Sequence, residues 1–440
     1  MKTTAPNSEN LEVRSEKGNQ DSSFSIPNSH FSPHPPALVP KLRFPEFRGA
    51  EGWTEKPLKT AAHINPANGG LPESFVYIDL ESVDAGELKA KERISRVGAP
   101  SRAQRVVERG DIIYQVVRPY QRNNLLCEFD DDENYVASTG YAQLRAKGSN
   151  RFLYQSIHTD SFVGRVIAKC TGSNYPAINS SDLADIHLPI PPTLPEQQKI
   201  AKCLSSVDEL MAAQARKVDA LKTHKKGLMQ QLFPREGETQ PRLRFPEFQN
   251  AGEWVEKVGG ELFSHRKEKG EEGLPIYSVT VNDGMVPRAS FDRNFYDIED
   301  PAGNRKVHKG DIAYNMMRMW QGAQGVAPED CLVSPAYVVL KPLGGVCSDF
   351  FASLFKLPQS LRLLTITSRG LTKDRLRLYF DDFAKMPLCV PDKAEQQRIA
   401  TCLSSLDALI TAEIQKHEAF KTHKKGLMQQ LFPSPEEVEG

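Results

Sequence analysis

The side chains best suited to chemistry form two matching sets, each placed after a Gly-Asp dipeptide. Gly110-Asp111 precedes the first set and Gly310-Asp311 the second, and tyrosine, arginine, an aromatic residue and glutamine recur in register behind both. The members are Tyr114, Arg118, Tyr120, Gln121 and Arg122 in the first set, and Tyr314, Arg318, Trp320 and Gln321 in the second. Arginine can donate two hydrogen bonds to guanine, glutamine can pair with adenine, and aromatic rings stack on exposed bases. We predict that both sets contact bases, although arginines paired with acids and aromatic rings in a core would give the same pattern.

A second candidate loop follows later in each half of the chain. The stretch 368–377 is basic and contains a glycine, which suits contact with phosphates or bases, but a solvated charged loop is as common. Its counterpart, 171–175, has no cation. The candidate residues are Arg369, Lys373 and Arg375 in the basic loop, and Asn174 and Tyr175 in its counterpart.

Catalytic signatures are scarce. The sequence has no phosphate-binding Gly-x-x-x-x-Gly-Lys, no Gly-x-Gly-x-x-Gly and no His/Cys cluster at metal spacing. Asp79, Glu87 and Lys89 match the loose carboxylate and lysine pattern of metal-dependent nucleases, but the corresponding strand at 277–281 has no such set. We expect a chain that is no enzyme by itself and binds no metal or cofactor, with a stand-alone DNA nuclease as the open alternative.

The candidate loops must be positioned by a duplicated framework. Residues 196–234 return as 395–433 with about 27 of 39 positions identical, which identifies an internal repeat. The hexapeptide Leu-Arg-Phe-Pro-Glu-Phe also occurs twice, at 42–47 and 243–248. The chain is therefore a tandem duplication.

Each long repeat has the pattern of one helix that packs along another. Apolar residues alternate at steps of three and four, the signature of a coiled-coil seam. The seam residues are Ile200, Leu204, Val207, Met211, Ala215, Val218, Leu221, Leu228 and Leu232, then Ile399, Leu403, Leu406, Ile410, Ile414, Phe420, Leu427 and Leu431. Capping-box patterns start both helices, and a proline ends both. Because neither helix can bury its seam alone, we predict that the two pack together as a rod of roughly 55 Å.

Polar residues that a seam does not need are repeated unchanged in both helices, while the segments between the helices have diverged. These residues should face solvent or a partner, and whatever the repeated surface does, it does twice. The predicted partner-binding residues are Lys222, His224, Lys225, Lys226 and Gln230, and Lys421, His423, Lys424, Lys425 and Gln429.

These patterns predict an α+β chain with a pseudo-two-fold internal repeat and two tandem α/β domains. Strand-like runs and amphipathic helices occur in the same order in both globular segments. The expected strands are 75–80, 106–117 and 135–144, then 274–281, 307–316 and 331–341; the expected helices are 151–168 and 349–364. The expected divisions are a disordered polar tail at 1–40, domains at 41–195 and 235–394, a central helix at 196–234, and a C-terminal helix with a short tail at 395–440.

Composition sets outer bounds on the class of protein. The chain has 440 residues, 39% of them hydrophobic, and no apolar run long enough to span a membrane. Seven cysteines without a Cys-x-x-Cys pair argue against a disulfide framework or a zinc ribbon. We expect a cytoplasmic protein with no membrane partner. Its zero net charge requires that any positive surface for nucleic acid be local.

Together these motifs resemble the specificity subunit of type I restriction-modification enzymes. The resemblance rests on Glu-Gln-Gln-(Lys/Arg)-Ile-Ala opening each helix, Gly-Leu-Met-Gln-Gln-Leu-Phe-Pro closing it, and Leu-Arg-Phe-Pro-Glu-Phe before each domain. Gly-Asp-Ile with a following tyrosine and the proline-rich exits at 188–192 and 386–391 add to it. The match covers about 41–433, and the polar N-terminal tail departs from the family pattern.

The resemblance implies that DNA recognition and catalysis are carried out by different subunits. Each domain would be a target recognition domain that reads one half of a bipartite, asymmetric site in double-stranded DNA, and the antiparallel helices would set the spacing of the halves. The helices would also hold two methyltransferase subunits, which bind S-adenosylmethionine and methylate adenine at N6. Separate restriction subunits would cleave with ATP and magnesium. A DNA-reading scaffold for a methylation-only system is the other alternative.

Overall fold

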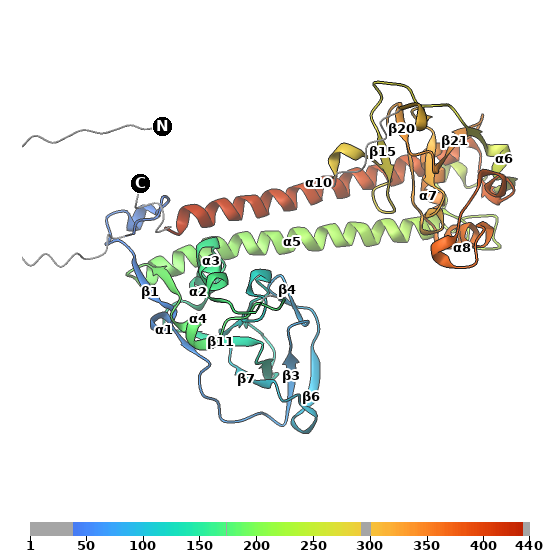
Figure 1. Cartoon of the computed structure of the whole chain (residues 1–440). Coiled ribbons are helices and arrows are strands. Elements are labelled where there is room, and N and C mark those ends of the chain that lie inside the picture. The colour runs from blue at the N-terminus through green and yellow to red at the C-terminus, as the bar shows by residue number, and fades with distance from the viewer. Residues whose placement is uncertain (1–37, 173, 292–300, 434–440) are drawn as a thin grey trace, which may run out of the picture.

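The structure is a computed structural model in which residues 38–172, 174–291 and 301–433 are described. Two long antiparallel helices form a rod, and one α+β domain lies at each end of it (Figure 1). Residues 1–37 and 434–440 of the predicted tails lie outside the described residues. Leu38, which was assigned to the disordered tail, is instead buried and forms an antiparallel bridge with Trp53. Within the described ranges, no helix is both long and apolar enough to cross a membrane.

The rod consists of α5 (Leu194–Leu232) and α10 (Lys393–Leu431), each 39 residues long. Asp392 caps α10, because its side chain accepts a hydrogen bond from the Glu395 amide at 2.9 Å. Thr193 makes no side-chain cap bond, and α5 instead has Pro195 in its first turn. Both helices end at a phenylalanine in extended conformation, directly before a proline. The two long helices predicted from the repeats are confirmed.

The seam of the rod differs from its predicted form at the centre. Gln214 is buried there, whereas Ala215 is half-buried and Ile414 is 39% exposed. The Gln214 side chain donates to the Glu413 carbonyl oxygen at 2.9 Å and to the Glu413 carboxylate at 2.6 Å. Steps of three and four continue through Gln214 and Glu413, so the seam keeps its period and carries a polar pair at mid-length. The assignment of Ala215 and Ile414 to the seam was wrong, since a search for apolar residues skips polar positions.

Two equivalent ion pairs cross the rod. Lys225 of α5 pairs with Asp407 of α10 at 2.5 Å, and Lys424 of α10 pairs with Asp208 of α5 at 2.7 Å. Lys225 and Lys424 hold the same place in the repeat, as do Asp208 and Asp407. The pairs are related by the approximate two-fold axis expected from the duplication.

Each Leu-Arg-Phe-Pro-Glu-Phe segment clamps one end of the rod. The Leu42 amide donates to the Gln430 carbonyl at the end of α10, and Arg43 makes two hydrogen bonds, at 2.7 and 2.8 Å, with the Glu196 carboxylate at the start of α5. At the other end, Leu243 bonds Gln231 of α5, while Arg244 bonds Glu395 of α10 at 2.8 and 2.6 Å. Each clamp therefore joins the start of one helix to the end of the other.

The first domain contains two four-stranded sheets, in the orders β6-β3-β10-β7 and β2-β11-β8-β9, and the pairs β1-β12 and β4-β5. Only β10 and β3 are parallel among the described pairs of these sheets. Its strands are β1 (Thr54–Pro57), β2 (Ala62–Ile64), β3 (Ser74–Ile78), β4 (Val83–Asp84), β5 (Glu87–Leu88), β6 (Glu92–Ser95), β7 (Ala103–Val107), β8 (Ile112–Gln115), β9 (Leu125–Leu126), β10 (Tyr135–Ser138), β11 (Tyr141–Ala146) and β12 (His187–Ile190). Its helices are α1 (Leu58–Ala61), α2 (Asn150–Ser156), α3 (Asp160–Lys169) and α4 (Ser180–Ala184).

The second domain repeats one of these sheets. The order β14-β21-β18-β19 corresponds to β2-β11-β8-β9, and the pairs β13-β22, β15-β16 and β17-β20 accompany it. Its strands are β13 (Val255–Val258), β14 (Phe263–Arg266), β15 (Tyr277–Val279), β16 (Met285–Pro287), β17 (Arg305–Val307), β18 (Ile312–Asn315), β19 (Gln324–Val326), β20 (Cys331–Val333), β21 (Tyr337–Pro342) and β22 (Pro387–Val390). Its helices are α6 (Gly259–Leu262), α7 (Ser348–Leu354), α8 (Pro358–Thr367) and α9 (Phe380–Phe383).

The Gly-Asp dipeptides break what the sequence suggested were single strands. The expected strand at 106–117 is divided between β7 and β8, because Gly110 takes φ +88° and turns the chain. Asp111 is buried at this turn and pairs with Arg145 at 2.8 Å; Asp311 pairs with Arg266 at 2.5 Å in the second domain. The strand at 307–316 is divided in the same way, and the helix expected at 151–168 is the pair α2 and α3.

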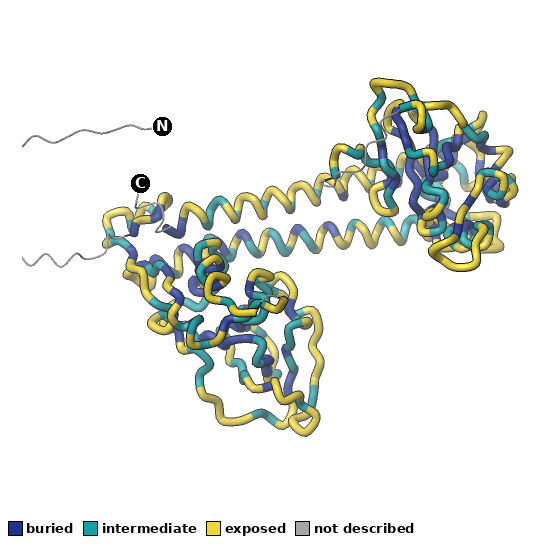
Figure 2. The backbone as a smooth tube through the Cα atoms, in the orientation of Figure 1, coloured by how far each residue is buried: buried dark blue, intermediate teal, exposed yellow. Residues whose placement is uncertain are grey.

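The rod ends are part of the domain cores. Phe432, after α10, lies against Trp53 and Phe152 with ring centroids 6.0 and 5.6 Å away. Phe233, after α5, is similarly placed against Trp254 and Phe350, at 6.2 and 5.2 Å. In Figure 2 the buried residues run from each domain into the adjoining helix ends, while the middle of the rod is mostly exposed. The domains are therefore fixed to the rod by apolar packing as well as by the clamps.

We expect Arg43→Met to lower the free energy of unfolding by about 3–5 kcal/mol, because it leaves the Glu196 carboxylate, 1% exposed, without its counter-ion. Chemical denaturation of the full chain measures this. Arg398→Met is the matched control: Arg398 pairs with Glu247 at the other end of the rod, but both side chains are nearly half exposed. We expect it to cost less than about 1 kcal/mol. Equal losses in the two variants would contradict the clamp.

Candidate nucleic-acid interface

In the first domain, the structure brings the two predicted loops together. The turn after β8 contains the 3-10 helix Pro119–Gln121, flanked by Arg118 and Arg122 in left-handed conformations with φ +54° and +56°. The Arg118 amide donates to the Pro176 carbonyl at 2.7 Å, and its guanidinium lies 4.4 Å from the centroid of the Tyr175 ring. Left-handed backbone at two non-glycine residues is costly, and such strain is concentrated at functional sites.

The second domain has the same arrangement. The Leu378 amide donates to the Met316 carbonyl at 2.9 Å, as the Ile178 amide does to Val116 at 3.0 Å in the first domain. The basic loop is closed by backbone hydrogen bonds between Arg369 and Arg377, and the Arg377 guanidinium lies 3.9 Å from the Met317 sulfur, just before the 3-10 helix Met319–Gln321. Loops separated by some 50 residues in the sequence thus form one surface in each domain.

Most of the predicted contact residues lie on these surfaces. Tyr120 and Tyr175 are 50% and 65% exposed, which is unusual for large aromatic side chains. Also exposed are Gln121, Asn174, Arg318, Gln321, Arg369, Lys373 and Arg375, whereas Arg118, Arg122 and Trp320 are half-buried. Several have protein partners: Gln121 accepts from Gln115 at 2.9 Å, and Trp320 donates to the Met317 carbonyl at 3.1 Å.

Tyr114 and Tyr314 are a correction to the predicted set. Both are buried, at 1% and 0% exposure, and desolvation raises the pKa of each hydroxyl. Tyr114 lies edge-on to Phe162, and Tyr314 packs near Phe383. Neither ring can stack on a base in this conformation, so the core reading that the sequence left open is correct for both.

Sequence reasoning missed the apolar tip of the basic loop. Leu371 is fully exposed, and Arg369, Arg375, Arg377 and Tyr379 surround a cavity of about 590 Å³ beside it. The Arg369 guanidinium lies 5.5 Å from the Tyr379 ring centroid and pairs with Asp382 at 2.7 Å. The available signal was Arg377, a further cation two residues after Arg375 within the basic loop.

Comparison with known proteins identifies the family. The family model described as the type I restriction modification DNA specificity domain matches residues 126–223 and 237–419. The chain belongs to this family. The second match includes the whole second candidate surface, whereas the first includes Asn174 and Tyr175 but begins after the 118–122 turn. Each match includes most of the adjoining rod helix, so both halves of the duplication are members.

Individual relatives are consistent with this assignment. The chain is 27% identical over 281 residues to a Methanocaldococcus jannaschii protein named as the MjaX specificity subunit of a type I restriction enzyme; the match covers 59% of this chain and 61% of that protein. It resembles the S subunit of a type I restriction-modification system from M. genitalium, with TM-score 0.55, 16% identity, and coverage of 90% of this chain and 100% of the other. A chain from a structural study of assembly and conformational transition in the type I R-M system gives TM-score 0.53 at 22% identity, covering 87% and 98%. The two-domain fold predicted from the sequence is confirmed.

The residues of the nuclease alternative have local roles in this family member. One Asp79 carboxylate oxygen accepts from the Glu81 and Ser82 amides and from the Ser82 hydroxyl, as a turn cap does. Lys89 pairs with Glu87 at 3.0 Å on the surface. Among the described residues, no three His, Cys, Asp or Glu side chains are grouped so that they could hold a metal ion.

The repeated polar residues of the rod have two kinds of environment. Lys225 and Lys424 form the cross-helix pairs, a structural role that the sequence did not reveal. The others are exposed: Lys222, His224, Lys226, Gln230, Lys421, His423, Lys425 and Gln429. Within the described ranges these exposed residues, unlike Lys225 and Lys424, form no ion pair between the two helices, so they are the ones that remain candidates for binding a partner.

We expect Tyr114→Phe to change the free energy of unfolding little, because the buried Tyr114 hydroxyl has no hydrogen-bond partner. Tyr314→Phe removes a hydrogen bond to the Leu378 carbonyl at 3.3 Å and should cost about 1 kcal/mol. Thermal unfolding of the two variants measures the difference, and DNA affinity should be unchanged in both. Loss of DNA binding in a variant that still folds would show that its tyrosine hydroxyl contacts DNA after all.

Proposed function

We propose that this chain is the DNA-reading specificity subunit of a type I restriction-modification system, and that each domain recognises one half of a split target. The observation that carries the proposal is that a surface with arginines and exposed aromatic side chains occurs once in each half of the duplicated chain. Arginine and glutamine can read base edges in the major groove, and exposed rings stack on or wedge between bases. Because the two surfaces differ in sequence, the two half-sites would differ as well.

The rod supports recognition of two separated half-sites. Its helices of 39 residues extend about 58 Å and hold the domains at opposite ends (Figure 1). Half-sites one turn apart on DNA are separated by roughly 34–36 Å, which lies within this span. A pseudo-two-fold rod would present the domains in opposite directions, as a bipartite target requires.

The partner subunits would carry the chemistry. Two methyltransferase subunits would dock on the repeated exposed residues of the helices, one toward each end of the rod, related by the approximate two-fold axis. They would bind S-adenosylmethionine and flip an adenine out of the duplex for N6 methylation. Restriction subunits with ATP and magnesium would complete the complex, while this chain would contribute recognition and geometry rather than catalysis.

Co-expression of the full chain with its genomically adjacent methyltransferase subunit, followed by single-molecule sequencing of host DNA, tests the proposal. We expect methyl-adenine in both halves of one split motif. A soluble complex that leaves the genome unmodified would contradict the assigned role.

Exchange of residues 41–192 for those of another family member should change one half of the methylated motif and preserve the other. The physical reason is that each surface is formed within one domain, and the rod separates the two. Methylome sequencing reads both halves at once. A motif altered in both halves would refute independent reading.

A heptad inserted in both helices, after Ala212 and after its repeat equivalent Thr411, should lengthen the spacer of the motif. Seven residues add about 10 Å, or about three base pairs, while a whole heptad preserves the seam. An insertion in α5 alone is the control, since it would misalign Lys225 with Asp407 and should destabilise the protein. An unchanged spacer with full activity would contradict the role of the rod as a ruler.

A further inference from the structure

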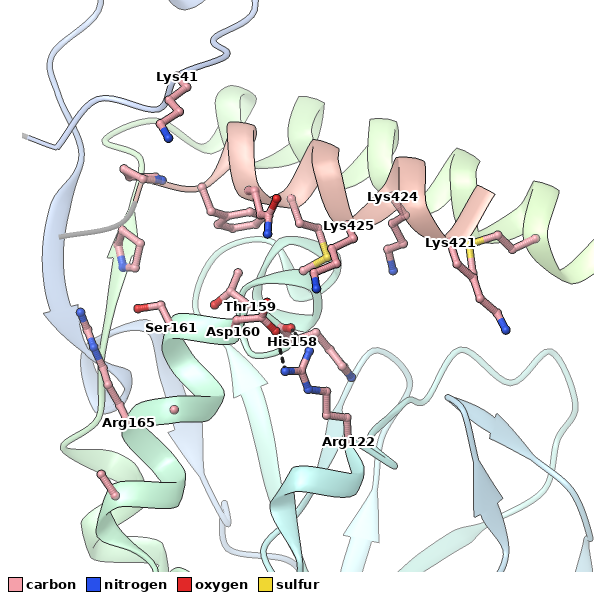
Figure 3. Close-up of a pocket in the computed structure, with 18 residues that line it drawn as sticks. Lys41, Arg122, His158, Thr159, Asp160, Ser161, Arg165, Lys421, Lys424 and Lys425 are labelled. Carbon is pink, nitrogen blue, oxygen red and sulfur yellow. Dashed lines mark hydrogen bonds and ion pairs between the residues drawn. The ribbon is translucent and has the colours of Figure 1, made fainter. Parts of the chain in front are cut away.

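A cavity of about 1090 Å³ lies between the first domain and the end of α10. Its lower wall is the start of α3 with the turn that contains Arg122, and its upper wall is the last turns of α10 (Figure 3). Lys424 and Lys425 extend from α10 toward Thr159, Asp160 and Arg122 in this view. The cavity thus joins residues predicted to contact DNA with residues predicted to bind a protein partner.

The lining is strongly cationic. Its positive side chains are Lys41, Arg122, Arg165, Lys421, Lys424 and Lys425, and its one carboxylate is Asp160. Arg122 pairs with Asp160, Arg165 with Glu55, Lys421 with Glu418 and Lys424 with Asp208. Lys425 forms no ion pair with any carboxylate of the described chain. Lys425 therefore contributes a positive charge that is not offset by an ion pair within the described residues.

The backbone adds a further positive component. Thr159 caps α3, a helix of ten residues, and accepts from the Phe162 amide at 3.3 Å. The amides of Asp160 and Ser161 are in the first turn, where no intrahelical acceptor exists, and both residues line the cavity. His158 adds no charge: Nδ1 donates to the Tyr154 carbonyl at 2.6 Å, and desolvation, with nearby Lys424, lowers its pKa to about 4.

The opposite end of the molecule shows which features are particular to this cavity. The left-handed position held by Arg122 is held by Gly322 in the second domain, with φ +87°. Arginine is costly in this conformation, whereas glycine is not. Leu363 of α8 stands where α3 has Arg165. Arg362 of α8 stands where α3 has Gly164, so both helices carry one cation in this turn. The feature particular to the first domain is the strained arginine, which the common fold does not require.

We propose that this cavity binds a phosphate of the DNA backbone, held chiefly by Lys425 and Arg122. The inference rests on the proposed function, because Arg122 directly follows the Tyr120 and Gln121 surface, and a strand that contacts this surface would continue toward α10. Phosphates are bound by lysine, arginine and helix N-termini, all of which meet here. Lys425 is thereby assigned to DNA instead of to the methyltransferase. His423, which does not line the cavity, keeps its predicted partner role.

Binding of a labelled random-sequence duplex to the full chain, measured over a range of salt concentrations, tests the proposal. Lys425→Gln should weaken binding several-fold and make the slope of log affinity against log salt shallower by about one, the signature of one lost phosphate contact. Arg122→Gly, which relieves the strained backbone, should act in the same direction. Lys202→Gln is the matched control, because Lys202 is an exposed lysine of α5 at the same end of the rod and does not line the cavity.

The outcomes separate this site from the proposed function. The loss from Lys425→Gln should be equal for the methylated motif and for random DNA, whereas Tyr175→Ala should weaken only binding to the motif. An unchanged salt slope in a chain that still distinguishes the motif would overturn the phosphate site alone. An equal effect of Lys202→Gln, or normal DNA binding with lost methyltransferase assembly, would also overturn it. Failure of the wild-type chain to distinguish any motif would refute the proposed function instead.

Discussion

The buried arginine-glutamate pair at each end of the rod is the interaction on which the architecture depends. Arg43 with Glu196, and Arg244 with Glu395, join a segment before each domain to the first turn of the helix that follows it. The same segment bonds the last turn of the other helix through a backbone amide. Since a carboxylate that is 1% exposed cannot be left unpaired cheaply, domain, entry segment and both helices are held as one unit.

Polar groups within the rod fix how the helices align. An apolar seam of constant period would tolerate a shift by one heptad, but such a shift would separate Lys225 from Asp407 and Lys424 from Asp208. The Gln214 and Glu413 pair lies near the approximate two-fold axis and differs between the copies. Pairing of α5 with another α5 would place glutamine against glutamine, and pairing of α10 with another α10 would place carboxylate against carboxylate. The Gln214 and Glu413 pair therefore favours α5 with α10.

The duplication separates what must stay constant from what can vary. The clamps, the cross-helix ion pairs and the phenylalanines after each helix are the same at both ends, because they set the geometry. The candidate contact loops differ in length and charge, although both are attached to equivalent strands by equivalent hydrogen bonds. A specificity subunit benefits from this division, since a loop can change without disturbing the rod. The left-handed arginine at the cavity beside Lys425 belongs to one end, since Gly322 takes its place at the other.

The sequence by itself determined the repeat, the two long helices, the order of domains and the family. It could do so because helical period and repeated motifs are local properties, readable residue by residue. Only the tertiary structure decided that Tyr114 and Tyr314 are core residues, that Lys225 and Lys424 join the helices, and that Arg122 and Lys425 share a cavity. Burial and pairing depend on which distant segments meet. The end of α10 packs against the first domain, which is more than 200 residues earlier in the chain, and no local sequence pattern contains such a contact.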